Sequence, residues 1–273
     1  MASTPVDPPV HGPLLASTGD ASRRRLRRVF VEGFRALDVA EPLVSFDSDR
    51  PASAVRASMR ARGFDLAGVR VEGLVAGYVS RGELESGSCG DHLRPFGHDD
   101  VVDGGASLQE VIQSLAVNRR CFVTVLDRAA AIVTLEDLEK PPVRMFLFGM
   151  ITILEMLVSR YVDAAFPGES WTLHVAPGRL EKARELMAER QRRGHACRLV
   201  DCLQFSDKGQ LALAVGDVGA RLAPSMSGKE AKRALKELEQ LRNNLAHGQE
   251  IISSGWDRIV RFSSRLDELL ESM

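Results

Sequence analysis

An internal repeat between residues 41 and 138 constrains the fold of this chain more than any other feature. Each copy has an opening strand, a helix and two strands joined by a turn, and this order predicts two copies of one α+β unit. Both copies end on a hydroxyl residue followed three positions later by a carboxylate, Ser80 with Glu83 and Thr134 with Asp137. The four predicted elements are residues 41–46, 54–61, 67–70 and 74–79 in the first copy, and 101–103, 108–116, 121–126 and 130–133 in the second.

The amino-acid composition limits the kinds of binding partner that the chain can have. The chain has 273 residues, 36 Lys and Arg against 37 Asp and Glu, and a net charge of −1. A globally basic nucleic-acid binder is not indicated, so any RNA contact must come from a local patch. The four cysteines form no C-x-x-C pair, which favours reduced thiols in a cytoplasmic protein. Cys89, His92 and His98 match no zinc template, so we predict a polar loop there and no metal site.

The end of the second copy carries a recognisable motif. Residues 131–138, Ala-Ile-Val-Thr-Leu-Glu-Asp-Leu, resemble the signature of CBS motifs, with Ala131 where glycine is usual. The repeat therefore resembles a tandem CBS pair, a Bateman module. The resemblance implies that Asp137 holds the ribose hydroxyls of a regulatory adenine nucleotide and that Thr134 contacts its phosphate. Ser80 and Glu83 occupy the corresponding places in the first copy. The alternative that Thr134 and Asp137 only cap a helix stays open, because caps use the same residues.

After Pro141-Pro142 the chain becomes strongly apolar over residues 143–162. The uncharged part, residues 145–154, is about half of the length that a membrane-spanning helix needs. Glu155 and Arg160 interrupt the remainder. We therefore predict no membrane span but a buried helix that joins two modules and contributes to an oligomer interface.

A second helical pattern runs from Ser227 to Glu250. Ser227 and Glu230 predict a capping box, and apolar residues recur at three- and four-residue steps. Beside this stripe, Arg242, Asn243 and His247 share a polar facet. A guanidinium binds phosphate oxygens, an imidazole moves protons near neutral pH, and a carboxamide orients either one. An ordinary exposed helix face remains the alternative interpretation.

The whole string Leu-Arg-Asn-Asn-Leu-Ala-His, residues 241–247, resembles the Arg-x4-His motif of HEPN domains. The resemblance implies an all-α bundle that dimerises and a metal-independent ribonuclease whose catalytic residues are Arg242, Asn243 and His247. Members of the fold that have lost catalysis also exist, so activity stays open.

Together the patterns predict an α+β fold with three parts: a flexible tail with a basic segment (1–37), a tandem CBS module (38–141) and an all-α HEPN-like helical bundle (142–273). The predicted function is a nucleotide-regulated endoribonuclease that acts on RNA as a homodimer and requires no cofactor for catalysis. The alternative is a non-catalytic, nucleotide-sensing dimeric regulatory protein. For either function the predicted location is the cytoplasm, without a membrane partner.

Overall fold

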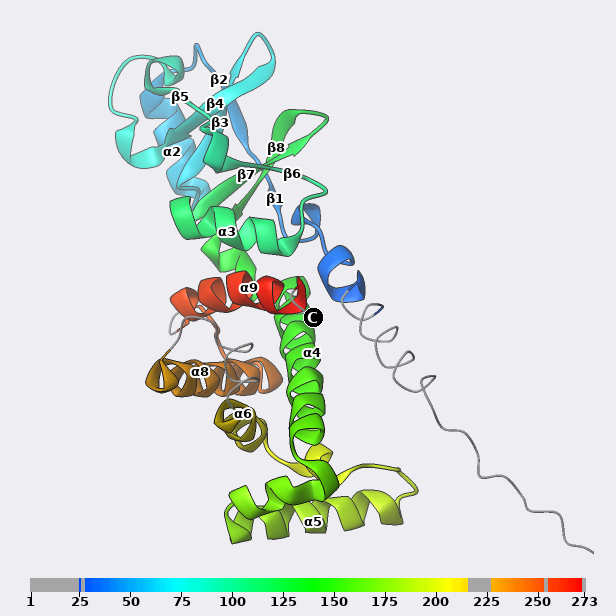
Figure 1. Ribbon diagram of the computed structural model, residues 1–273. Coiled ribbons are helices and arrows are strands. Elements are labelled where there is room, and N and C mark those ends of the chain that lie inside the picture. Colours follow the sequence, from blue (N-terminus) through cyan, green and yellow to red (C-terminus); the bar gives the residue numbers. More distant parts are fainter. Residues whose placement is uncertain (1–24, 26–27, 216–226, 253–254, 272–273) are drawn as a thin grey trace, which may run out of the picture.

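The computed structural model describes residues 25, 28–215, 227–252 and 255–271, and Figure 1 shows them as an α+β part followed by a helical part. Most of the predicted tail lies outside the described residues. Residues just before the predicted boundary at 38 already contact the second repeat, because Ala36 is fully buried and its N–H donates to Ala106 O at 2.9 Å.

The α+β part contains the repeat that the sequence predicts, as two four-stranded sheets with the orders β2-β3-β4-β5 and β1-β8-β7-β6. In each copy a parallel strand pair encloses a helix, and an antiparallel hairpin follows. The first copy comprises β2 (Ser45–Asp47), α2 (Ala52–Arg62), β3 (Leu66–Val71) and β4 (Leu74–Ser80). The second comprises β6 (Val101–Asp103), α3 (Leu108–Asn118), β7 (Arg120–Val125) and β8 (Arg128–Thr134).

Each sheet is completed by a short strand. Strand β5 (Arg94–Pro95) follows β4 in the sequence and pairs with it, so the first sheet is built from consecutive strands. Strand β1 (Glu41–Pro42) precedes the first copy but pairs with β8 of the second. The second sheet therefore contains a strand from the other side of the first repeat.

Both hairpins turn through two residues with positive φ, as the right-handed strand twist requires. In the first these are Glu72 (φ 51°) and Gly73 (φ 81°), and in the second Leu126 (φ 51°) and Asp127 (φ 59°). Only one of the four is a glycine, so the other three adopt a backbone conformation that is costly for residues with a Cβ.

The described C-terminal part is helical and is built around α4 (Pro141–Ala165), which Figure 1 shows as the long helix running down from the sheets. Its helices α6 (Phe205–Ala214), α8 (Gly228–Ala246) and α9 (Trp256–Glu271) lie on one side of α4, and α5 (Pro177–Arg192) crosses its lower end. Helix α4 contacts α6 and α8, whereas α9 contacts α3 of the second repeat. The predicted buried connecting helix is therefore confirmed.

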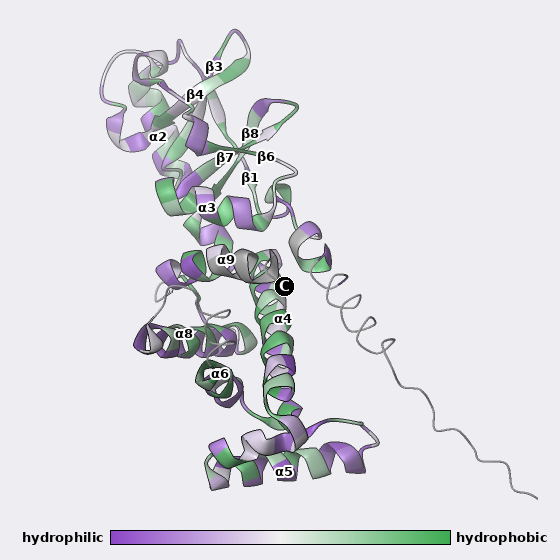
Figure 2. Cartoon of the chain, in the orientation of Figure 1, coloured by the Kyte–Doolittle hydropathy of each residue, from purple (hydrophilic) through white to green (hydrophobic). Residues whose placement is uncertain are grey.

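By length and apolar composition, α4 is the helix within the described residues that would be able to cross a membrane. Figure 2 shows it as predominantly hydrophobic, in contrast to the mixed faces of α5 and α8. Most of its apolar side chains are buried against the rest of the chain, among them Phe146, Leu147, Ile153 and Leu157. Burial of this kind is typical of a core helix.

Candidate functional site

Helix α8 begins and packs as its sequence predicts. Ser227 Oγ accepts a hydrogen bond from Glu230 N at 3.3 Å, and the Glu230 carboxylate accepts from Ser227 N at 2.8 Å. This reciprocal pair satisfies backbone donors that a helix start leaves free. The apolar stripe faces α4 and α6, with Ala231 and Leu241 buried. The stripe fixes which side of α8 the polar residues occupy.

Arg242 and Asn243 both line a cavity of about 350 Å³ between α8 and the segment that joins α5 to α6. Their side chains lie side by side, with Arg242 Nη1 3.4 Å from Asn243 Oδ1. The opposite wall includes Arg190 and Gln204. The lining also includes Glu155, Glu239 and Asp201, so the two guanidinium groups share the cavity with three carboxylates. Glu155 pairs with Lys208 and Asp201 pairs with Arg198, and the guanidinium groups and carboxamides are lining groups able to donate hydrogen bonds to an anion.

His247 does not join this arrangement. The sequence predicts a helix through Glu250, but α8 ends at Ala246 because Gly248 takes φ +67° and Gln249 N donates to Asn244 O at 2.9 Å. These are the features of a glycine-terminated helix end. His247 becomes the capping residue, exposed, with its backbone N donating to Asn243 O at 3.0 Å. Within the described residues, its side chain makes no hydrogen bond or ion pair, and it is not among the residues that line the cavity.

A buried ion pair supports the floor of the cavity. Lys208 Nζ lies 2.8 Å from Glu155 Oε1, and Lys208 is only 3% exposed. Lys208 belongs to α6, so the polar stretch 206–210 is helical. Gly209 lets α6 approach Leu235 so closely that a Cβ there would lie 2.3 Å from Leu235 Cδ1. The sequence contains one indication of this ion pair: Glu155 is a charged residue within an apolar stretch, and a charge that becomes buried requires a partner of opposite charge.

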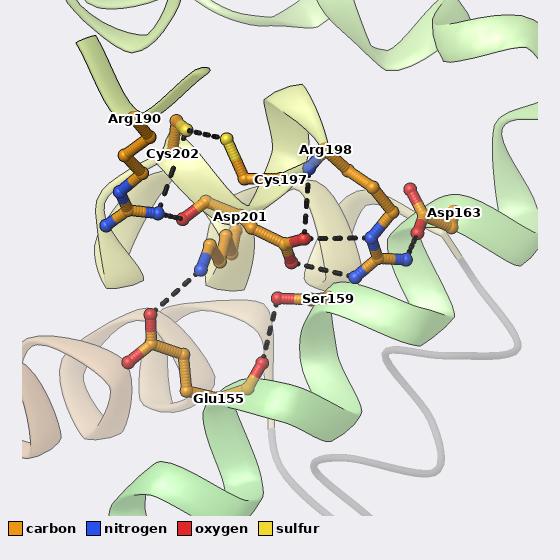
Figure 3. Close-up of polar contacts among 9 residues, drawn as sticks. Glu155, Ser159, Asp163, Arg190, Cys197, Arg198, Asp201 and Cys202 are labelled. Carbon is orange, nitrogen blue, oxygen red and sulfur yellow. Dashed lines mark hydrogen bonds and ion pairs between the residues drawn. The ribbon is translucent and has the colours of Figure 1, made fainter. Parts of the chain in front are cut away.

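Figure 3 shows a second charged group beside that floor. Arg198 pairs with Asp201 at 2.7 Å and also with Asp163 of α4. Burial alone would raise the pKa of Asp201, but the Arg198 guanidinium outweighs it and holds that pKa below its usual value. At Asp163 burial dominates and raises the pKa. Arg198 thus fastens the segment between α5 and α6 to α4.

In the second repeat, the structure brings Thr134 and Asp137 together. Asp137 Oδ2 accepts from Thr134 N at 2.7 Å and from Thr134 Oγ1 at 3.0 Å, and Lys140 Nζ lies 2.8 Å from Asp137 Oδ1. Asp137 is buried, 7% exposed. Burial opposes the charge on Lys140, but the carboxylates of Asp137 and Glu41 raise its pKa overall. The capping interpretation is therefore realised in this structure, with both side chains directed at one another.

The first repeat differs at the same positions. Ser80 precedes the helical turn Arg81–Glu83, and its side chain makes no capping hydrogen bond. Glu83 instead forms an ion pair with Arg94 of β5. The pair is partly exposed, so Glu83 is fastened more weakly than Asp137.

A polar connection links the second repeat to the end of α8. Glu139 Oε1 accepts from the backbone N of Ile251 at 2.7 Å and of Ile252 at 3.0 Å. Its other oxygen pairs with Arg144 at 3.0 Å, and Arg144 donates to the backbone oxygens of Asn244, Leu245 and Gln249. Glu139 lies two residues after Asp137, so the turn that carries Asp137 also holds the loop that carries His247.

Among the described residues, no group of three or more His, Cys, Asp or Glu side chains is arranged to bind a metal ion. The two thiols closest to each other are Cys197 and Cys202, with Sγ atoms 4.0 Å apart. They are separated by four residues, a longer spacing than that of a C-x-x-C pair.

No family model and no curated protein matches the chain. Solved structures of CBS domains are similar to it over less than half of its length. One is the CBS domain of a bacterial CNNM/CorC family Mg²⁺ transporter in complex with ATP, with 15% identity, coverage of 48% of this chain and 98% of that one, and a TM-score of 0.36. Another is CBSX2 in complex with AMP, with 17% identity, coverage of 39% of this chain and 93% of that one, and a TM-score of 0.35. A third is a hemolysin-like protein containing a CBS domain from Oenococcus oeni PSU, with 11% identity, coverage of 42% of this chain and 93% of that one, and a TM-score of 0.34.

Proposed function

We propose that the chain is a nucleotide-responsive, metal-independent endoribonuclease of the HEPN type that acts as a homodimer. The observation that carries the proposal is the cavity of about 350 Å³ in which Arg242 and Asn243 face Arg190 and Gln204. An RNA phosphodiester offers two unesterified oxygens, and guanidinium groups bind such oxygens in a planar fork.

In the proposed reaction, His247 takes the proton of the RNA 2′-hydroxyl as that oxygen attacks the adjacent phosphorus. Arg242 stabilises the negative charge that develops on the phosphate, and Asn243 orients the reacting groups. The bond from phosphorus to the 5′-oxygen breaks, that oxygen gains a proton, and the products carry a 2′,3′-cyclic phosphate and a 5′-hydroxyl.

The position of His247 outside the cavity of its own chain is the reason that the proposal includes a second copy. A two-fold axis would bring the histidine of one copy toward the arginine of the other. Helix α4 offers an apolar surface for such a contact, because Met145, Phe148 and Met156 are 56%, 41% and 39% exposed and occupy one side of the helix.

For the α+β part we propose an adenine nucleotide as ligand, held by Thr134 and Asp137 in the second repeat and by Ser80 and Glu83 in the first. The resemblance of residues 131–138 to the CBS signature supports this ligand. Nucleotide binding would first release Asp137 from Thr134. Because Glu139 lies on the same turn, the change would reach the loop after α8. We further propose a cytoplasmic location without a membrane partner.

The decisive experiment incubates the full chain with a mixture of RNAs in excess chelator, with and without adenine nucleotides, and maps the RNA ends. We expect cleavage with cyclic phosphate ends, lost on Arg242→Ala or His247→Ala. Arg233→Ala is the matched control, because Arg233 lies on the same helix with a 73% exposed side chain and does not line the cavity. Mixing the two inactive variants should restore part of the activity if each site draws on two chains. Cleavage that needs a divalent metal, or that survives in folded His247→Ala protein, contradicts the mechanism.

A second function, a non-catalytic nucleotide-sensing dimeric regulatory protein, is favoured by one specific observation. The imidazole of His247 and the cavity of Arg242 are separated within the chain, while the Glu139–Arg144 contacts connect the repeats to the end of α8. The same experiment distinguishes the two functions, since a sensor binds nucleotide and leaves every RNA intact.

A further inference from the structure

The segment between α5 and α6 contains two thiols in near contact. Cys197 lies in irregular backbone after α5, and Cys202 ends the short helical turn Leu199–Cys202. Their sulfur atoms are 4.0 Å apart, and Figure 3 shows the two side chains directed toward one another. A disulfide bond is about 2.05 Å long, so the sulfurs need to approach by about 2 Å. The irregular backbone around Cys197 allows such a movement without breaking a helix.

The two thiols also differ from the other cysteines in access. Cys197 is half-buried, and Cys202 lines the cavity of Arg242 and a neighbouring one of about 260 Å³. A small oxidant can therefore approach this pair. In contrast, Cys89 and Cys121 are fully buried, and burial raises the pKa of the Cys121 thiol to about 12. Both thiols are 0% exposed, so an oxidant does not reach them and these two serve as internal controls.

The surroundings of the two sulfur atoms favour different roles in a reaction with an oxidant. Burial raises the pKa of Cys202, with the nearby Cys197 thiol contributing in the same direction, whereas the Arg190 guanidinium opposes the shift. Arg190 Nη1 lies 3.8 Å from Cys202 Sγ and also donates to Asp201 O at 3.3 Å. Cys197, the more exposed thiol, is the one placed to meet the oxidant first, and Cys202 is placed to react with the product.

We propose that Cys197 and Cys202 form a reversible intramolecular disulfide when the protein meets a hydroperoxide. The Cys197 thiolate attacks a peroxide oxygen, an S–O bond forms, the O–O bond breaks, and the released alkoxide or hydroxide takes a proton. Cys202 then attacks the sulfenic sulfur of Cys197, the S–S bond forms, the S–O bond breaks, and water leaves with the Cys202 proton. The dithiol loses two electrons and the peroxide gains them.

The disulfide would change the cavity that Arg242 lines. Cys202 contacts Arg190, the guanidinium on the opposite wall, and the residue before it, Asp201, is held by Arg198. Pulling Cys202 toward Cys197 therefore moves one wall while the Arg198–Asp163 contact keeps the other end of the segment on α4. The redox state of one pair of thiols would set the width of the cavity.

Trypsin provides a direct test, because it cleaves after Arg198 and separates the two cysteines into peptides 194–198 and 199–208. Full-length reduced protein is treated with a small excess of hydrogen peroxide, alkylated and digested. We expect the free thiols to fall from four to two, and the two peptides to appear as one species two hydrogen masses lighter than their sum. A thiol reductant should restore both peptides and all four thiols.

Cys197→Ser and Cys202→Ser should each abolish the linked species, whereas Cys89→Ser should leave it unchanged. Circular dichroism before and after oxidation checks that the fold persists, and Cys197→Ser keeps the test valid if the more buried Cys202→Ser protein does not fold. The proposal is wrong if native oxidised protein retains four thiols, if Cys197 proceeds to sulfinic acid without a link, or if the link joins two chains. Equal oxidation of Cys89 and Cys121 would also overturn it, since this would show that the pair has no special reactivity.

Discussion

The two repeats have the same strand and helix order but different relations to the rest of the chain. The first repeat encloses its own core, formed by residues such as Phe46, Met59 and Leu84. The core of the second repeat, with Leu108 and Ile112, is continuous with the helical part through α4 and α9. One topology therefore encloses a separate core in one place and forms the base of a larger core in the other.

The ends of the two repeats show the same difference. In the second repeat Asp137 is buried among hydrogen bonds and Glu139 reaches the loop after α8, whereas the corresponding Glu83 pairs with Arg94 on the surface and Glu85 is exposed. The comparison indicates that a signal from the repeats to the helical part would pass through the second repeat. Four experiments test this asymmetry.

The largest expected effect comes from core truncation in each repeat. Met59→Ala and Ile112→Ala both remove fully buried side chains, and each should lower the free energy of unfolding by about 2–5 kcal/mol. Amide hydrogen exchange should become faster in β3 and β4 for Met59→Ala, but in α3, α4 and α9 for Ile112→Ala, because α3 contacts α9. Equal acceleration in α9 by both variants would show that the two cores act as one.

The second largest effect is expected at the carboxylates that end the two repeats, Asp137 and Glu83. Asp137→Ala removes the acceptor of the half-buried Thr134 backbone N–H and should cost about 2 kcal/mol of stability, measured by urea unfolding. Glu83→Ala breaks a surface ion pair and should cost less than about 1 kcal/mol. If an adenine nucleotide binds, calorimetry should show that Asp137→Ala loses most of the affinity and Glu83→Ala less. Asp137→Asn, which keeps one acceptor oxygen, separates loss of the cap from loss of the charge.

Glu139→Ala tests the connection to the helical part. It leaves two backbone N–H groups and Arg144 without their carboxylate, so we expect a loss of about 1–2 kcal/mol and faster exchange of the Ile251 and Ile252 amides. Glu85→Ala, at the corresponding position of the first repeat, should change neither quantity measurably. Unchanged exchange at residues 251 and 252 in Glu139→Ala would remove the proposed route between the two parts.

The smallest effects concern the hairpin turns. Leu126 is 89% exposed at φ 51°, so Leu126→Asn loses little burial and should raise stability by about 0.5–1 kcal/mol, because Asn tolerates this backbone region. In the first hairpin, Gly73→Ala should lower stability by about 1 kcal/mol through its φ of 81° alone, since no atom lies within 4 Å of the added Cβ. Thermal unfolding would measure both; a stabilising Gly73→Ala would contradict the backbone explanation.

The sequence predicts the repeats well because their signals are local. Alternation and turns define the hairpins, and the helix expected over 54–61 is the central part of α2 (Ala52–Arg62). The pairing of β1 with β8 was not predicted, since nothing in Glu41–Pro42 indicates a partner at Ala131 and Ile132. The polar stretch 206–210 is helical because Lys208 pairs with Glu155 and Gly209 packs closely against Leu235, and no local sequence pattern indicates these contacts.

The candidate site was predictable only in part. Spacing correctly placed Arg242 and Asn243 beside the apolar stripe, where they line one cavity. The sequence contained the signal that removes His247 from the helix, namely Gly248, but the periodic pattern continued past it. Arg190, on the opposite wall, comes from a helix about fifty residues earlier, and its approach depends on tertiary packing.

The pairing of β1 with β8 makes the two repeats unequal as pieces of chain. A cut between β5 and β6 would leave the first sheet, β2-β3-β4-β5, complete, but would leave the second sheet without β1. The first repeat, residues 45–95, therefore carries every strand of its sheet, whereas the second repeat expressed singly would have an open sheet edge beside β8. A backbone nick between β5 and β6 would leave two fragments that are still joined by the paired strands β1 and β8. The second repeat thus depends on residues that precede the first.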